Sequence, residues 1–438
     1  MSDLHAQTVP YVRDTMLPEQ SPPAAQSGAV RWLRENLFSS WFNAALTLLG
    51  VAVIYFFIAH YFPWFRHGVW NAASLQECRA IIAEKWGPEA SGACWAVIRE
   101  RWNQIIFGFY PTELYWRPIL TFVLLFVAMA PVLYTQLPRV LLWGTVAYPL
   151  VAMWLLWGGS IWPVVMIAFG FMLGGVILRI VSRWSALGAL VAAIVVPVLF
   201  WAFLMGPIDD DLSYIAPIAL RPIGSDQFGG FLLAIVIGVG GIVMSLPLGI
   251  MLALGRQSDM FLIKTLSVVF IEFIRGVPLI TLLFVASTLL NYFLPPGTNF
   301  DIILRVMILV TLFSAAYIAE VIRGGLAALP RGQYEAADAL GLEYWRAQRL
   351  IILPQALKIS IPGIVSTFIG MFKDTTLVTF VGLYDPLKSI PDAIRNNFEW
   401  KGIYWEPFIF VGVIFFVLNF AMSRYSMYLE RRLQRDHH

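Results

Sequence analysis

Long apolar runs, separated by short polar segments, recur along almost the whole chain of 438 residues. A run of about 20 apolar residues is long enough to cross roughly 30 Å of hydrocarbon as a helix. The pattern therefore predicts an all-α polytopic membrane protein with about ten transmembrane helices, preceded by a polar, proline-containing tail at 1–36. The predicted spans are residues 41–62, 118–135, 139–157, 161–180, 186–206, 229–254, 262–291, 302–322, 358–383 and 407–428.

Composition agrees with this pattern and excludes several kinds of chemistry. The chain is 59% hydrophobic and 13% charged, whereas soluble domains carry about 45–50% apolar and about 25% charged residues. Five His and two Cys leave little for a metal or haem site. The patterns GxxxxGK[ST] and HExxH are absent, so we expect no catalytic residue, no metal and no bound cofactor in this chain.

The distribution of basic residues orients the predicted helices. Cytoplasmic loops of membrane proteins carry an excess of Lys and Arg. Ten crossings place the long loop at 63–117 and the acidic run Asp209, Asp210 and Asp211 on the side opposite to the N-terminus, so both termini are predicted to be cytoplasmic. The basic residues that share the side of Arg31 and Arg34 are Arg139, Arg179, Arg183, Arg256, Lys264, Arg424, Arg431, Arg432 and Arg435.

The loop at 63–117 contains both cysteines, Cys78 and Cys94. Disulfides form in oxidising compartments outside the cytoplasm, so two cysteines in one extracytoplasmic loop suggest a bridge. The alternative is two unrelated small residues. Several tryptophans in the same loop are consistent with a folded cap on the membrane surface.

One cytoplasmic connection, residues 323–358, is long and amphipathic. It predicts a short helix from Gln333 to Leu340, a break at Gly341, and a second helix from Tyr344 to Leu353 that Pro354 stops. Such a hairpin is most simply a docking surface for a soluble partner. A solvated connector is the alternative, but it would not need so many Leu, Ile and Ala residues.

The same loop resembles the EAA loop of ABC-importer permeases. The resemblance implies that its two short helices are coupling helices seated in a cleft of an ATP-binding subunit. Glu335 would then make the polar contact and Gly341 the bend, since glycine at a helix C-terminus tolerates a left-handed conformation. The residues that carry the match are Glu335, Ala336, Ala337, Gly341, Ile351, Leu353 and Pro354.

Neighbouring segments narrow the resemblance to polar amino-acid permeases. Residues 270–279 resemble their E-x-x-R-G-x-P stretch, and residues 373–377 their K-x-T-S-L segment, with Thr376 where Ser is usual. The similarity implies a type I ABC-importer permease core at 225–438. An N-terminal five-helix extension, residues 37–224, looks like that of the broad-specificity L-amino-acid permeases of Gram-negative bacteria.

That resemblance also implies a cellular setting. The chain would lie in the bacterial inner membrane, surrounded by lipid, and import L-amino acids from periplasm to cytoplasm. It would pair with a second permease subunit, a different paralogue, above two ATP-binding subunits that bind the ATP and Mg, and below a periplasmic amino-acid-binding protein. No nucleic-acid partner is expected.

Other functions remain as alternatives. A secondary amino-acid transporter often shows internal repeats, which are not apparent here, and it would not need the hairpin. A channel is a further alternative, and neither would have an ATPase partner. The glycines at Gly170, Gly174, Gly238, Gly240 and Gly241 fit close helix packing better than nucleotide loops.

Ionisable residues inside spans cost about 2.5–3.5 kcal/mol each on insertion scales and are functional candidates. Glu272 and Arg275 are three residues apart, so they share a helix face. They are expected to neutralise each other or to brace one helix against another. The alternative is contact with a zwitterionic substrate, Arg275 binding the carboxylate and Glu272 the amine.

A second group of candidates lies in the predicted ninth span. Lys373 and Asp374 precede Thr375 and Thr376, whose hydroxyls could serve a partly unwound helix. Helix capping and substrate contact are both open for this group. Glu320 lies near the cytoplasmic end of the eighth span and is expected to serve gating or to orient the hairpin.

Overall fold

The computed structural model describes residues 28–134, 136–293, 301–395 and 397–435. The chain divides into two compact units. The first comprises the described residues up to Val69 together with Arg79–Ala93. The second comprises Trp70–Cys78 and the described residues from Cys94 onwards, and it holds the candidate site.

The first unit contains one long apolar helix. Helix α1 (Gly28–Asn36) is followed by α2 (Trp41–Arg66), which starts where the Ser40 side chain accepts a hydrogen bond from the Asn43 N–H at 3.2 Å. No residue of α2 is buried in the structure. A helix that is apolar on every side fits a membrane span.

The second unit begins with most of the extension that follows α2. Helix α6 (Leu142–Trp157) is connected to α7 (Trp162–Val181) by a turn at Gly158 and Gly159. The turn leads into a two-residue strand β1 (Gly159–Ser160), antiparallel to β2 (Ala219–Leu220). Before these helices comes α3 (Leu75–Trp86), which has residues in both units. The elements of this part are α4 (Ala96–Phe107), η2 (Thr112–Leu114), α5 (Trp116–Leu133), η3 (Arg139–Leu141), α6 (Leu142–Trp157), α7 (Trp162–Val181), α8 (Ala186–Leu199), η4 (Phe200–Leu204), α9 (Met205–Ile215) and η5 (Ser225–Gln227).

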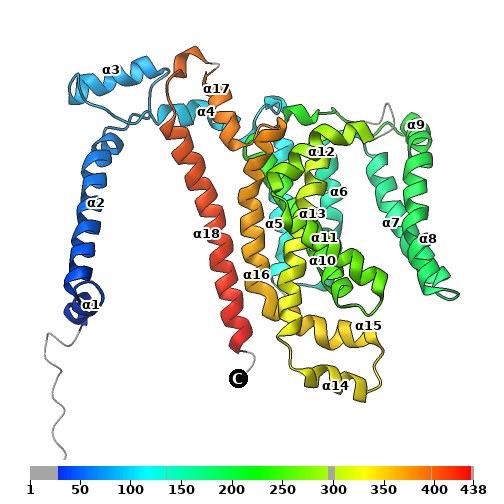
Figure 1. Cartoon of the computed structure of the whole chain (residues 1–438). Coiled ribbons are helices and arrows are strands. Elements are labelled where there is room, and N and C mark those ends of the chain that lie inside the picture. Colours follow the sequence, from blue (N-terminus) through cyan, green and yellow to red (C-terminus); the bar gives the residue numbers. More distant parts are fainter. Residues whose placement is uncertain (1–27, 135, 294–300, 396, 436–438) are drawn as a thin grey trace, which may run out of the picture. The chain divides into compact units, whose positions relative to one another are not determined.

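The remaining helices form the predicted permease core, in which α10, α13 and α16 pack side by side (Figure 1). Glycines permit these contacts, because a Cβ on Gly238 would meet the Phe372 ring at 2.7 Å and one on Gly241 would meet the Met371 sulfur at 3.1 Å. The core elements are α10 (Gly230–Gln257), α11 (Phe261–Gly276), α12 (Leu279–Phe293), α13 (Ile302–Ala327), α14 (Arg331–Ala339), α15 (Tyr344–Ala347), η6 (Gln348–Ile352), α16 (Leu353–Asp374), η7 (Thr375–Val381), α17 (Pro386–Arg395), η8 (Phe398–Trp400) and α18 (Trp405–Arg435).

Two clusters of buried apolar residues hold the second unit together. One contains Tyr110, Phe228 and Leu233 and joins the extension to the start of α10. The other contains Ile318, Ile322 and residues of α16 and lies next to α14 and η6. The second cluster therefore connects the membrane helices to the hairpin.

The junction between extension and core is a crossing of three backbones at glycine. Gly108 pairs with Phe228, and Gly229 pairs with Tyr384. A Cβ on Gly229 would lie 2.9 Å from the Gly108 Cα and 3.0 Å from the Tyr384 carbonyl oxygen, closer than ordinary contact. Side chains are excluded, so only glycine allows the three segments to meet here.

The number of spans agrees with the predicted ten, but one predicted span is wrong in shape. Among the described residues, nine helices are long and apolar enough to cross a membrane, or ten if a bent pair counts as one. The bent pair is α11 and α12, which turn by 101° instead of forming one helix over 262–291. Val277 is extended there, with φ −109° and ψ 132°, because a residue before proline (Pro278) avoids the helical region.

The fifth span also differs from its predicted end at residue 206. The helix continues through the wide turn η4 into α9, so Asp209, Asp210 and Asp211 are helical and do not lie in a loop. The apolar run ends before the helix does, because the last turns of α9 are polar but still hydrogen-bonded.

Candidate functional site

The hairpin between α13 and α16 turns at Gly341. Gly341 has φ +65° and an open Cβ position. Its N–H donates to the Asp338 carbonyl at 2.9 Å, and the Leu342 N–H donates to the Ala337 carbonyl at 3.2 Å. These two bonds form a Schellman motif, which needs a left-handed residue after the helix. The predicted left-handed conformation of Gly341 is confirmed.

One face of this hairpin, residues 331–352, packs on the membrane helices. Ala337 is 1% exposed, and Ile352 is fully buried in the cluster of α13 and α16. Tyr334 and Leu353 pack against the same cluster, and burial raises the pKa of the Tyr334 hydroxyl. The hairpin is therefore fixed to the spans at both of its helices.

The opposite face is open, acidic and apolar. Glu335, Ala336 and Asp338 are exposed. Leu340 and Trp345 expose 73% and 68% of their surface next to them. This face therefore combines exposed carboxylates with two large exposed apolar side chains.

The second helix of the hairpin does not stop at Pro354, contrary to the prediction. It runs from α15 through the wide turn η6 directly into α16, where Pro354 occupies the first turn. Within η6 the Leu353 N–H donates to the Gln348 carbonyl five residues earlier. Proline is tolerated in a first turn, and the wider turn avoids the clash that its ring makes with the preceding turn of a regular helix. The first helix, α14, starts at Arg331, two residues before the predicted Gln333.

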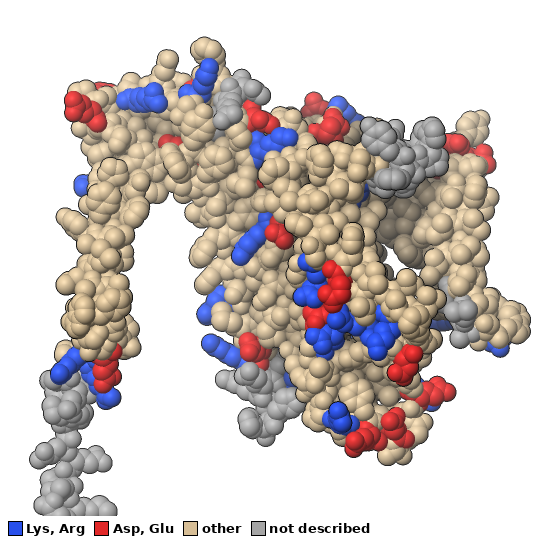
Figure 2. All heavy atoms as spheres, in the orientation of Figure 1, with Lys and Arg blue, Asp and Glu red and all other residues tan. Residues whose placement is uncertain are grey.

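A cluster of charged side chains joins α10, α11 and α13 near the hairpin (Figure 2). Glu320 is its centre: Arg323 donates to Oε1, while the Nη1 atoms of Arg256 and Arg275 lie 3.3 and 3.9 Å from Oε2. Three guanidinium groups and two carboxylates leave this arginine–glutamate cluster with a charge of +1. Its members are Arg256, Glu272, Arg275, Glu320 and Arg323.

The pairing within this cluster corrects one prediction. Glu272 and Arg275 do not neutralise each other, because Glu272 accepts a hydrogen bond from Arg256 at 2.8 Å. Arg275 lies near Glu320 and over the ring of Tyr317, 5.6 Å from its centre. Both residues of α11 thus contact other helices, and the choice between a bracing role and substrate contact stays a prediction.

The second group of intramembrane candidates lies at the end of α16. Thr375 donates to the Phe372 carbonyl at 2.7 Å, and Thr376 donates to the Lys373 carbonyl at 2.9 Å. These bonds cap the last turn of α16 where the tighter helix η7 begins. Lys373 is exposed, unlike the half-buried Asp374. It lines an open groove of about 480 Å³ between α16 and α18.

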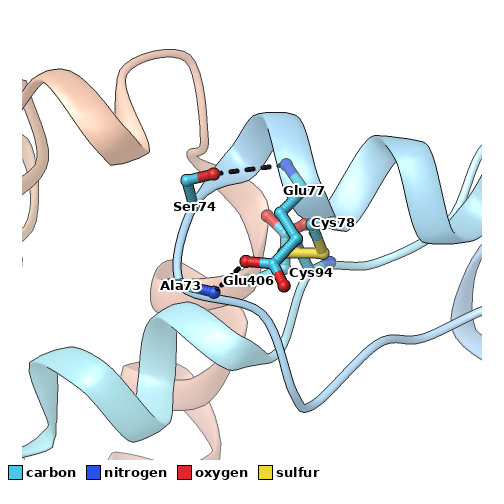
Figure 3. Close-up of a disulfide and its surroundings, with 6 residues drawn as sticks. All are labelled: Ala73, Ser74, Glu77, Cys78, Cys94 and Glu406. Atoms are coloured by element: carbon cyan, nitrogen blue, oxygen red, sulfur yellow. Dashed lines mark hydrogen bonds between the residues drawn. A yellow bond between two sulfur atoms is a disulfide. The ribbon is translucent and has the colours of Figure 1, made fainter.

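The loop that follows α2 is fixed by a disulfide within the second unit. Cys78 and Cys94 are joined, and both sulfur-bearing residues are buried (Figure 3). The Cys94 N–H donates to the Glu406 carboxylate at 2.9 Å. Glu406 is in the first turn of α18 and 5% exposed, so this loop is tied directly to the last span.

Sequence reasoning missed several residues of these sites. In the sequence Arg256 indicates only the orientation of the chain, whereas in the structure it links two acidic residues of different helices, Glu272 and Glu320. Gln333 and Gln355 form a side-chain hydrogen bond across the hairpin. Neither pairing follows from local spacing, because the partners belong to different helices.

These features define a multi-pass, predominantly helical membrane protein with an exposed hairpin between two of its spans. The family model for binding-protein-dependent transport system inner membrane components matches residues 245–435. The chain is 65% identical to the glutamate/glutamine/aspartate/asparagine transport system permease protein BztC of Rhodobacter capsulatus, over 98% of this chain and 99% of that protein.

Two further relatives show how the likeness is distributed. The inner membrane amino-acid ABC transporter permease protein YhdY of Escherichia coli is 38% identical over 93% of both chains. The probable glutamine ABC transporter permease protein GlnP of Bacillus subtilis is 31% identical over 46% of this chain and 91% of its own length. The chain therefore belongs to the family of amino-acid ABC transporter permeases, as the permease subunit of an importer.

Proposed function

We propose that this chain is one of the two permease subunits of an ATP-driven importer. The conformational change of the ATPase would be transmitted to the spans through the hairpin from α14 to η6. The observation that carries the proposal is the hairpin itself: it turns at Gly341 in a Schellman motif, exposes Glu335, Leu340 and Trp345, and packs Tyr334 against the cluster of α13 and α16. Because the hairpin is joined directly to α13 and α16, movement of a partner bound to its open face would displace both helices.

The proposed assembly follows the family. Two ATP-binding subunits hold ATP and Mg, and this chain is non-catalytic. A second permease subunit, a different paralogue, completes the pathway, and a periplasmic amino-acid-binding protein delivers substrate. Both termini are cytoplasmic, residues 37–224 form the extension, and residues 225–438 form the core.

We propose that the substrates are several polar L-amino acids. The name of the relative at 65% identity gives glutamate, glutamine, aspartate and asparagine, which supports a set rather than one amino acid. Uptake of labelled glutamate into vesicles, with each of the other three and with leucine as competitors, tests this set. Competition by the three but not by leucine supports it, and equal competition by leucine favours broader specificity.

Two pairs of variants test the hairpin. Gly341→Val forces a β-branched residue into a left-handed turn, whereas Gly341→Asn tolerates that conformation. Glu335→Arg reverses the charge of the open face, whereas Glu335→Gln only removes it. We expect Gly341→Val and Glu335→Arg to abolish co-purification of the ATPase or ATP-driven uptake. Gly341→Asn and Glu335→Gln should keep most of both.

The contrary outcome is specific. Wild-type uptake in both Gly341→Val and Glu335→Arg removes the coupling role of the hairpin. Uptake by the purified chain without any ATPase, driven by an ion gradient, identifies a secondary transporter instead. Ion currents without accumulation identify a channel.

A further inference from the structure

The hairpin is closed by a hydrogen bond that the chain path does not require. Gln333 lies in the first turn of α14, and Gln355 lies in the first turn of α16. The Gln355 Nε2 donates to the Gln333 Oε1 at 3.0 Å and to the Ile351 carbonyl at 2.9 Å. One side-chain amide thus joins the first hairpin helix, the wide turn η6 and the membrane span.

The chemistry fixes the direction of this bond. The Ile351 carbonyl can only accept a hydrogen bond, so the Gln355 atom that faces it must be the amide nitrogen. Gln333 must then present its oxygen. Gln355 is the donor to both partners, and Gln333 is needed only as an acceptor.

The position of the bond gives it a mechanical consequence. Apart from it, α14 is joined to α16 by the exposed turn at Gly341, by the wide turn η6 and by the packing of Tyr334 against the cluster of α13 and α16. Glycine turns and wide helical turns bend more easily than regular helix, so α14 could tilt while α16 stayed in place. The bond between the Gln333 and Gln355 side chains links α14 directly to the start of α16. With this bond in place, α14, η6 and α16 should move together.

We propose that the Gln333–Gln355 amide pair is a brace that transmits displacement of α14 to the span α16. The inference rests on the proposed docking of an ATPase at the hairpin. It adds two partly buried positioning residues, Gln333 and Gln355, which are not among the exposed residues Glu335, Leu340 and Trp345.

Two isosteric variants separate this role from a general one. Gln333→Glu still accepts from Gln355, so the brace remains. Gln355→Glu has no proton to donate to either oxygen, so the brace is lost and a carboxylate faces two acceptors. Each variant adds one negative charge to the same hairpin, which makes them matched controls for each other.

The first measurement is hydrogen–deuterium exchange of α14 amides in the full purified chain. We expect faster exchange in Gln355→Glu than in wild type, by about fivefold, the population change that one neutral hydrogen bond supports. Gln333→Glu should exchange like wild type. Equal exchange in the two variants overturns the brace, whether or not an ATPase binds.

The second measurement is uptake per ATP hydrolysed in vesicles holding the whole transporter. Gln355→Glu should still co-purify with the ATPase and hydrolyse ATP, while uptake per ATP falls about fivefold; Gln333→Glu should couple normally. Equal coupling in both variants overturns the inference and leaves the docking proposal intact. If the wild-type chain does not associate with an ATPase, both the docking proposal and this inference are overturned.

Discussion

Gly325 of α13 offers the sharpest test of how closely the hairpin-bearing spans must pack. A Cβ at this buried position would collide with the Ser360 hydroxyl and lie 2.6 Å from the Ala356 carbonyl oxygen, both on α16. Ordinary contact begins at about 3.4 Å. Gly325→Ala therefore requires α13 and α16 to separate by about 0.8 Å, since a backbone carbonyl cannot rotate out of the way.

The adjacent Gly324 supplies the control for this change. It is exposed, and a Cβ there meets nothing within 4 Å. Both substitutions gain about 0.5–1 kcal/mol from replacing glycine in a helix, but only Gly325→Ala adds overpacking, which costs typically about 1–3 kcal/mol. The free energies of unfolding of the two variants should differ by about 1–3 kcal/mol.

Thermal unfolding in detergent measures the difference, and vesicle uptake measures its effect on coupling. Gly324→Ala should unfold at or above the wild-type temperature and transport normally. Gly325→Ala should unfold below Gly324→Ala and transport more slowly, because its span contact at the hairpin is displaced. Indistinguishable unfolding temperatures would refute the reasoning from close packing.

Other changes address the disulfide and the arginine–glutamate cluster. Alkylation without reductant should label neither Cys78 nor Cys94, and mass mapping should recover their peptides linked; labelling of both thiols contradicts this. Glu320→Gln removes the carboxylate partner of Arg275 and Arg323, while Arg256 keeps Glu272, and it should cost about 1–3 kcal/mol of stability. The more exposed Glu272→Gln should cost at most about 1 kcal/mol, and equal unfolding temperatures argue against Glu320 as the centre. Arg275→Ala should assemble poorly if it braces α11, and a fully assembled variant with basal ATP hydrolysis but no uptake would favour substrate contact instead.

The spans could be predicted because a hydrocarbon layer imposes a length and a composition on every crossing helix. The exception shows what that signal omits. Val277 and Pro278 are apolar, so they continue the hydrophobic run over 262–291 while they break its helix. The proline was a visible sign, but apolarity alone does not report backbone shape.

The candidate site could be predicted where a local motif determines it and not where distant helices meet. The spacing around Gly341 placed the hairpin and its left-handed turn. The partners of Glu272 and Gln333 belong to α10 and α16, and contacts between separate helices depend on packing. The prediction that Pro354 stops the second hairpin helix was wrong, because proline disrupts the interior of a helix but is tolerated in its first turn.

The glycine crossing at Gly108 and Gly229 also constrains the order in which the protein is made. About 120 residues separate Gly108 from Phe228, a delay of roughly 6–24 s at ordinary synthesis rates of about 5–20 residues per second. Tyr384 arrives later still. During this time the backbone at Gly108 lacks its partner strand at Phe228. The full crossing of three backbones closes only after Tyr384 has been synthesised, which makes the junction a late step in folding.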